Sequence, residues 1–91
     1  MEDLKTKYNK PDDLIITFAD TDPVPLSDVP YKFKSLTVQA DGDNAEVMFV
    51  GGENPSTQLI NNASQPFENG DLSKIYVKGA VGDKAICLIE A

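Results

Sequence analysis

The sequence predicts an all-β protein: a compact antiparallel β-sandwich or flattened barrel of about six to eight short strands, with an extended N-terminal arm. Three observations carry this prediction. From Tyr31 onward, short runs alternate apolar and polar side chains, as half-buried strands do. Clusters rich in Gly, Asn and Asp separate these runs and are typical of turns. Apolar residues nowhere recur at helical spacing over about ten positions.

The N-terminal residues differ in composition from the rest of the chain. We expect residues 1–13 to form an extended arm and residues 14–91 to form the β-sandwich domain. The arm is polar and charged, with Leu4 and Tyr8 as its apolar anchors. Two interpretations stay open for the arm: a disordered terminus, or a tether that becomes ordered on a neighbouring subunit. The β-branched and aromatic run Leu14–Phe18 predicts the first strand.

The next segments are less regular. Ala19 to Pro30 contains three prolines, which predicts an extended, irregular connection. The strand that follows, Tyr31 to Ala40, is apolar first at odd and then at even positions. A strand repeats every two residues, so one uninterrupted strand cannot turn both sets to the same face. Either a bulge lies near Lys34 and Ser35, which is the favoured interpretation, or the two halves serve opposite faces.

A strong turn signal, Asp41-Gly42-Asp43-Asn44, predicts a hairpin between this strand and a return strand over Ala45–Val50. The return strand alternates, with one face formed by Ala45, Val47 and Phe49 and the other by Glu46, Met48 and Val50. The segment from Gly52 to Asp71 is polar and predicts a long loop. Within it we expect a brief strand at Gln58–Ile60 and a single inward anchor at Phe67.

A second hairpin is predicted near the C-terminus. The run Leu72–Lys78 alternates, with Ile75 and Val77 facing inward and Lys74, Tyr76 and Lys78 facing outward. Gly79 to Asp83 forms the turn, and Lys84–Glu90 returns. Because the return strand is apolar on both faces, we expect it to lie centrally in a sheet or to be covered by a neighbour.

Composition excludes several classes of function. The chain of 91 residues has no histidine, arginine or tryptophan, and its one cysteine is Cys87. These residue types carry most proton transfer at neutral pH, bidentate phosphate recognition and nucleophilic chemistry. We therefore expect no enzyme, no catalytic residue, no cofactor and no metal site. Cys87 is expected to be a small buried apolar residue, and the Asp-rich clusters are expected to be turns and not calcium loops.

Charge and hydropathy limit the partners. The net charge of −7 repels phosphate backbones, so we expect no nucleic-acid partner. No apolar run reaches the roughly 20 residues that span a membrane, and the N-terminus lacks the features of a signal peptide. These properties predict no membrane partner and synthesis in a cytoplasm. Oligomerisation is a common aid to the stability of so small a domain.

Four side chains are candidates for binding a protein partner: Leu4, Tyr8, Tyr31 and Tyr76. Leu4 and Tyr8 are the apolar anchors of the arm. Tyr76 lies between two lysines on a predicted solvent face, where a tyrosine serves as an interface anchor or is simply one exposed aromatic residue.

Two segments carry a resemblance to a known class of proteins. They are SLTVQADGDNAEVMFVGG, residues 35–52, and NGDLSKIYVKGAVGDKAICLIE, residues 69–90, and together they cover 40 of the 91 residues. This arrangement resembles small β domains in structural proteins of tailed bacteriophage virions, of the capsid decoration (cement) or head-fibre-base type. Where those proteins usually carry a P-G-E turn between the hairpins, this chain has residues 65–70.

The resemblance implies a function without catalysis. It implies a capsid decoration protein that binds the outer capsid surface and stabilises the shell, after synthesis in the host cytoplasm. Its partners would be the major capsid protein or neighbouring virion subunits, and it would form a homo-oligomer, with a trimer favoured. The alternative is an attachment module of a head fibre or tail fibre that recognises a host surface.

Overall fold

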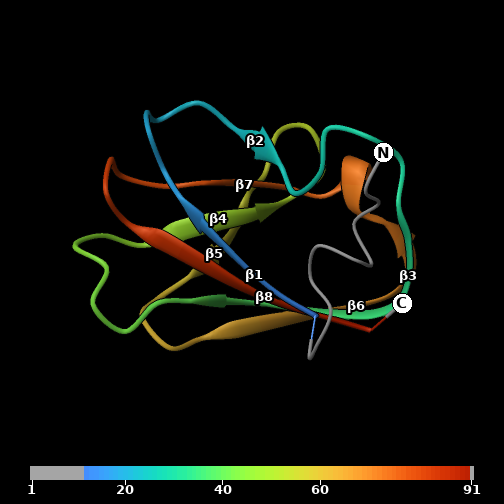
Figure 1. Cartoon of the computed structure of the whole chain (residues 1–91). Helices are drawn as coiled ribbons and strands as arrows, with labels where there is room; N and C mark the ends of the chain where they lie inside the picture. The colour runs from blue at the N-terminus through green and yellow to red at the C-terminus, as the bar shows by residue number, and fades with distance from the viewer. Residues whose placement is uncertain (1–11, 91) are drawn as a thin grey trace.

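Two four-stranded antiparallel sheets lie against each other in the computed structural model, which describes residues 12–90 (Figure 1). Sheet A has the strand order β1-β8-β3-β6, and sheet B has the order β2-β7-β4-β5. The strands are β1 (Asp12–Thr17), β2 (Val24–Pro25), β3 (Lys32–Ala40), β4 (Met48–Gly51), β5 (Thr57–Leu59), β6 (Ser64–Asp71), β7 (Tyr76–Lys78) and β8 (Lys84–Glu90). A short 3-10 helix, η1 (Leu72–Lys74), precedes β7. The predicted β-sandwich is confirmed, and it has eight strands among the described residues.

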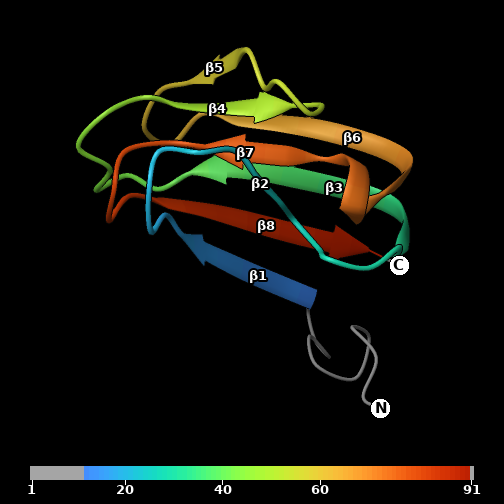
Figure 2. The ribbon, with the colours of Figure 1, turned by 90° about the horizontal axis from the view of Figure 1, so that it is seen from above.

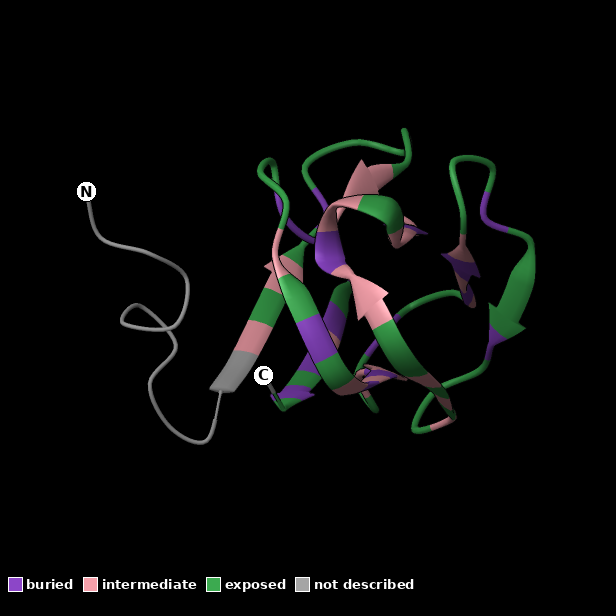
Figure 3. Ribbon diagram, turned by 90° about the vertical axis from the view of Figure 1, so that its right-hand side faces the viewer, coloured by how far each residue is buried: buried purple, intermediate pink, exposed green. Residues whose placement is uncertain are grey.

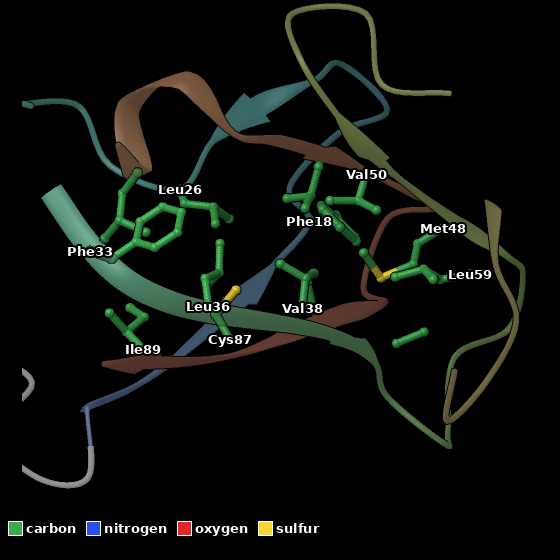
Figure 4. Close-up of a cluster of buried hydrophobic side chains, with 14 residues drawn as sticks. Phe18, Leu26, Phe33, Leu36, Val38, Met48, Val50, Leu59, Cys87 and Ile89 are labelled. Carbon is green, nitrogen blue, oxygen red and sulfur yellow. The ribbon is translucent and has the colours of Figure 1, made fainter. Parts of the chain in front are cut away.

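The core fills the space between the sheets, where both contribute aliphatic side chains (Figure 4). Leu36, Val38 and Cys87 of sheet A are at most 1 % exposed, as are Met48 and Val50 of sheet B. Burying such side chains is the dominant favourable contribution to folding, about 1.5–3 kcal/mol for each large one.

Alternating burial along the strands confirms the period-two pattern (Figure 3). In β4, Met48 and Val50 are buried, whereas Phe49 between them lies on the outer face of sheet B. In β8, Ala85, Cys87 and Ile89 are buried. The prediction of a central position for this strand is confirmed, because β8 lies between β1 and β3.

Both predicted hairpins are wrong. The strands on either side of each turn belong to different sheets: β3 lies in sheet A and β4 in sheet B, and likewise β7 lies in sheet B and β8 in sheet A. The turn residues were recognised correctly, but the chain uses these turns to cross from one layer to the other. Turn chemistry fixes the local reversal and does not fix which strand becomes the neighbour.

The predicted loop between Gly52 and Asp71 contains two strands. The expected strand near Gln58 is β5. The eight-residue strand β6 was missed, since Ser64–Asp71 contains proline, glycine and asparagine and only one large apolar residue. It forms an edge of sheet A, where half its side chains face solvent and proline is tolerated. Phe67 packs against the core, as predicted.

The phase change in β3 is real, and both halves bury their apolar residues in the same core. Phe33 is 4 % exposed and Leu36 is 1 % exposed. No residue is inserted, because Phe33 pairs with Gly70 and Ser35 pairs with Glu68 in one register. Lys34 and Asn69 would form the pair between these two, but they do not pair. The φ of Asn69 is 53°, in the left-handed region. Both strands therefore leave one residue unpaired at this point, whereas the predicted bulge would have added a residue to one strand only.

The first strand begins two residues earlier than predicted. Asp12 and Asp13 pair with Ile89 and Leu88, so β1 extends into the predicted arm. At its other end, Phe18 lies just beyond β1 and is 2 % exposed. The remainder of the predicted arm, with Leu4 and Tyr8, lies outside the described residues.

Candidate interaction surface

The two candidate tyrosines that the structure describes lie in different segments of the chain. Tyr31 precedes β3 of sheet A, and its ring packs against the core. Its main-chain N–H donates to Oδ1 of Asp71 (3.1 Å), and its carbonyl accepts from the N–H of Leu72 (2.9 Å). Tyr76 belongs to β7 of sheet B. The strand partners of Tyr76 are Pro25 and Gly51, in β2 and β4, and the partner-binding role of each tyrosine stays a prediction.

Tyr76 lies on the outer face of sheet B, as predicted. Its neighbour Val77 is buried in the core, so the alternation of the strand turns Tyr76 and Lys78 outward. Tyr76 pairs with Pro25 of β2 on one side and with Gly51 of β4 on the other. At Gly51 the segment of Pro55 approaches closely, since a Cβ there would lie 3.4 Å from Pro55 Cα, and Tyr76 itself is half-buried.

A second aromatic residue shares this face. Phe49 pairs with Lys78 on one side and with Gln58 of β5 on the other. The Nζ of Lys78 lies 5.7 Å from the centre of the Phe49 ring. At this distance the ring attracts the ammonium group and holds the lysine over the strand. The outer face of sheet B thus combines two aromatic rings with one cation.

A shallow pocket opens beside these residues. Its volume is about 280 Å³, and Val47, Phe49 and Ala80 form its apolar wall. Glu46, Lys78 and Thr21 supply polar groups, and Gly79 completes the lining. Pockets for drug-sized ligands measure about 300–1,000 Å³, so this one better suits a single side chain or a small ring. We call Tyr76, Phe49, Lys78 and the pocket the sheet B platform.

Two contacts below the surface position the platform. The carboxylate of Asp83, 6 % exposed, accepts hydrogen bonds from the N–H groups of Ala45 (2.9 Å) and Glu46 (3.1 Å). These bonds hold the crossing from sheet A to sheet B and place Glu46 at the pocket. Gly79 lies against Phe18 so closely that an added Cβ would be 2.7 Å from the ring. The floor of the pocket therefore rests on the core.

The Asp-rich clusters form turns. In one, Oδ1 of Asp20 accepts from the N–H of Asp22 (2.9 Å). In the other, Asp41 accepts from the N–H of Asn44 (3.2 Å) through its main-chain carbonyl. Among residues 12–90, acidic and cysteine side chains nowhere gather in a group that could hold a metal ion. Turn formation, as expected, accounts for these clusters.

Cys87 is buried in the core, as predicted. Burial away from water raises the pKa of its thiol to about 12, because the thiolate would be desolvated. At neutral pH the residue is therefore a protonated, apolar group.

The outer face of sheet A is aliphatic near its β1 edge. Ile15 is 60 % exposed and pairs with the half-buried Ile86, and Leu88 is 45 % exposed in the same strand as Ile86. Sequence reasoning recognised β8 as apolar on both faces but did not identify this patch as exposed. The outward residues of β8 meet no further layer among the described residues.

Comparison of the chain with models of protein families, with curated proteins and with solved structures found no match. In the part of the chain that the structure describes, no helix has the length and apolar character needed to span a membrane.

Proposed function

We propose that this protein is a structural protein of a tailed bacteriophage virion, a capsid decoration (cement) protein that binds the outer capsid surface and stabilises the shell. The sheet B platform is the surface through which it contacts the major capsid protein or a neighbouring virion subunit. The observation that carries the proposal is a pair of aromatic side chains, Phe49 and Tyr76, on the outer face of one sheet beside a small open pocket.

The chemistry of the platform suits a protein partner. Aromatic residues dominate the energetic centres of interfaces because they bury much area at low entropic cost. A pocket of about 280 Å³ accommodates one protruding side chain of the partner. Lys78 and Glu46 at its rim can then select a partner by charge.

The stabilising effect follows from mass action. A protein that binds the assembled shell and not its free subunits shifts the equilibrium toward assembly. No bond has to be made or broken, which agrees with the absence of histidine and arginine from the chain. As a homo-oligomer it would reach several capsid subunits at once; the trimer favoured by the resemblance remains a prediction.

Binding to capsids that lack the protein tests the proposal. We expect Tyr76→Ala to raise the dissociation constant at least about tenfold, the loss typical of one interface anchor. The control is Val81→Ala, which shortens an apolar side chain that is 66 % exposed on the turn between β7 and β8. Circular dichroism establishes that each variant is folded. Equal occupancy by wild type and Tyr76→Ala would refute the role of the platform.

The N-terminal segment needs a separate test. Removal of residues 1–11 leaves the pairs of Asp12 and Asp13 with β8 intact, whereas a longer deletion would damage the sheet. If the segment tethers the protein to the shell, this truncated chain loses capsid binding. Unchanged occupancy would contradict the tether.

The sheet B platform also supports the second candidate function, attachment to a host surface. An aromatic face flanked by Gln58, Lys78 and Glu46 offers the mixture of apolar area and a few polar groups that small ligands use. Binding of the isolated protein to host cells or to a glycan array, weakened by Phe49→Ala, would favour this alternative. Negative results in both assays would leave the capsid as the partner.

A further inference from the structure

β1 lies at an edge of sheet A, and among residues 12–90 its one strand neighbour is β8. Figure 2 shows β1 at the margin of the sheet, beside β8. An edge strand presents main-chain N–H and C=O groups to any strand that approaches it, and so acts as a template for pairing. The outer edge of β1 is therefore a candidate contact site.

Two main-chain hydrogen bonds identify which groups of β1 face away from the sheet. The N–H of Phe18 donates to the carbonyl of Asp83 (3.0 Å), and the carbonyl of Phe18 accepts from the N–H of Gly82 (2.9 Å). Successive residues of a strand direct these groups to alternate sides, so Ile16 and Leu14 also bond toward β8. The alternate residues direct their main-chain N–H and C=O groups away from the sheet. These residues are Asp13, Ile15 and Thr17.

The other edges of the sandwich are poorly suited to pairing. β6, at the far edge of sheet A, contains Pro66, which has no N–H to donate, and the left-handed Asn69. In sheet B, β2 has two residues including Pro25, and β5 has three residues. Prolines and short length are common protections of an edge. β1 has six residues and contains neither proline nor lysine, and its two charged residues, Asp12 and Asp13, take the first two positions of the strand.

We infer that the outer edge of β1 is a self-association site, which pairs antiparallel with β1 of a second copy of this chain across a twofold axis through Ile15. In this register Ile15 opposes the second copy's Ile15, and Asp13 opposes its Thr17. Each of these pairs brings outward main-chain groups together, which gives about six hydrogen bonds across the axis. Sheet A then continues from one copy into the other.

The side chains fit a second copy in this register. Leu14 opposes the second copy's Ile16, and in this register no aspartate of the sequence takes a position opposite another aspartate. Ile15, 60 % exposed, adjoins Ile86 and Leu88 on the outer face. The twofold axis sets this aliphatic patch beside its own copy, so the two Ile15 side chains contact each other at the axis and lose part of their exposure to water.

Moving the axis by two residues along β1, which shifts the register by four, weakens the match. An axis through Thr17 or Asp13 would place residues beyond the ends of β1 opposite the strand, and would leave outward groups without partners. An axis through Asp13 would also set two aspartates against each other. Of these three axes, the one through Ile15 pairs the most residues of β1 with β1 of the second copy.

Ile15→Lys tests the inference, with Ile60→Lys as a matched control. Both positions carry isoleucine at similar exposure, 60 % and 63 %, but Ile60 lies between β5 and β6, outside β1. On the axis, two lysines would face each other, and lysine is a natural protection of edges. We expect sedimentation of the full-length wild type and of Ile60→Lys to show dimers that dissociate on dilution. Ile15→Lys should dissociate at a concentration at least about tenfold higher.

Amide hydrogen exchange locates the contact. The amides of Ile15 and Thr17 should be protected in the dimer and exchange rapidly in Ile15→Lys, whereas that of Ile16, bonded toward β8, should be protected in both. A wild type that is monomeric at all concentrations, or trimeric, would overturn the inference. Protection of the Ile15 amide in a monomer would also overturn it, because the chain would then cover its own edge. The dimer inferred here is an alternative to the trimer that the resemblance favours. The experiment contains no capsid, so its outcomes do not depend on whether the protein binds one.

Discussion

The side-chain amide of Asn44 is bonded twice to the main chain of Lys84. Its Nδ2 donates to the carbonyl of Lys84 (2.9 Å), and its Oδ1 accepts from the N–H of the same residue (2.7 Å). The amide thus makes the two hydrogen bonds with the first residue of β8 that a residue of a paired strand would make. Asn44 is 7 % exposed, and its own carbonyl accepts from Nδ2 of Asn61 (2.8 Å). One side chain therefore joins the β3–β4 crossing to β8.

We expect Asn44→Ala to lower the free energy of unfolding by about 1–3 kcal/mol, because it removes the acceptor of the Lys84 N–H at a part-buried position, whereas the Lys84 carbonyl still accepts from the N–H of Asp41 (3.2 Å). Urea denaturation measures this change. Asp43→Ala is the control, since Asp43 is exposed in the same turn, and it should change stability by less than about 0.5 kcal/mol. Equal effects of the two substitutions would contradict the role given to the Asn44 amide.

Gly79→Ala is expected to destabilise the protein by about 1–3 kcal/mol, because the new Cβ would lie 2.7 Å from the ring of Phe18 and force it out of place. Gly52→Ala provides the matched comparison, as nothing lies within 4 Å of a Cβ at that position. Thermal unfolding followed by circular dichroism should separate the two variants. A Gly79→Ala protein as stable as Gly52→Ala would mean that Phe18 relaxes without cost.

The carboxyl group of Asp71 makes the free energy of unfolding depend on pH, and the direction of its pKa shift fixes the sign. Hydrogen bonds from the N–H of Tyr31 and from the N–H and hydroxyl of Ser73 lower the pKa of its carboxyl group below the ordinary value of 3.8. A lowered pKa in the folded state stabilises the protein above the unfolded pKa, and this contribution is lost as the pH falls through the folded pKa. We expect Asp71→Asn, which keeps an acceptor oxygen, to be less stable than wild type above about pH 5.

The difference in free energy of unfolding between wild type and Asp71→Asn should shrink toward zero as the pH is lowered further. Comparing the two proteins cancels the titration of the other carboxylates. A difference that stays constant down to acidic pH would show that the charge of Asp71 contributes nothing.

Cys87 is expected to be unreactive in the folded protein. With a thiol pKa of about 12 and a side chain in the core, almost no thiolate is present at pH 8 for an alkylating reagent or a disulfide exchange reagent to attack. The thiol should react in strong denaturant at the rate of an ordinary cysteine. Rapid labelling of the native protein would instead reveal frequent opening of sheet A between β1 and β3.

The strands with clean alternation were predictable from the sequence, and those defined by their neighbours were not. Met48, Val50 and Val77 face the core as their spacing indicates, and the apolar pattern of β8 predicted its central position. β6 could not be recognised, because a half-exposed edge strand needs few apolar residues. The pairing of β3 with β6 and β8 depends on packing between distant segments, which no local pattern records.

For the interaction surface too, local alternation was predictable from the sequence and the neighbours from distant segments were not. The outward position of Tyr76 followed from the alternation of Lys74 to Lys78, although the residues before Ile75 form η1 and not a strand. Phe49 and Glu46 were missed as its neighbours. They reach the platform because the chain crosses from sheet A to sheet B after Ala40, whereas the predicted hairpin would have kept both strands in one sheet.

The position of β8 between β1 and β3 also governs folding during synthesis. β1 finds its partner only when residues 84–90 have been made, about 70 residues after β1 itself. At about 5–20 residues per second, the ribosome needs roughly 4–14 s for that interval. Throughout it, the aliphatic residues Leu14 to Ile16 lack β8, their neighbour in the sheet. Sheet A can therefore close only after β8 has left the ribosome.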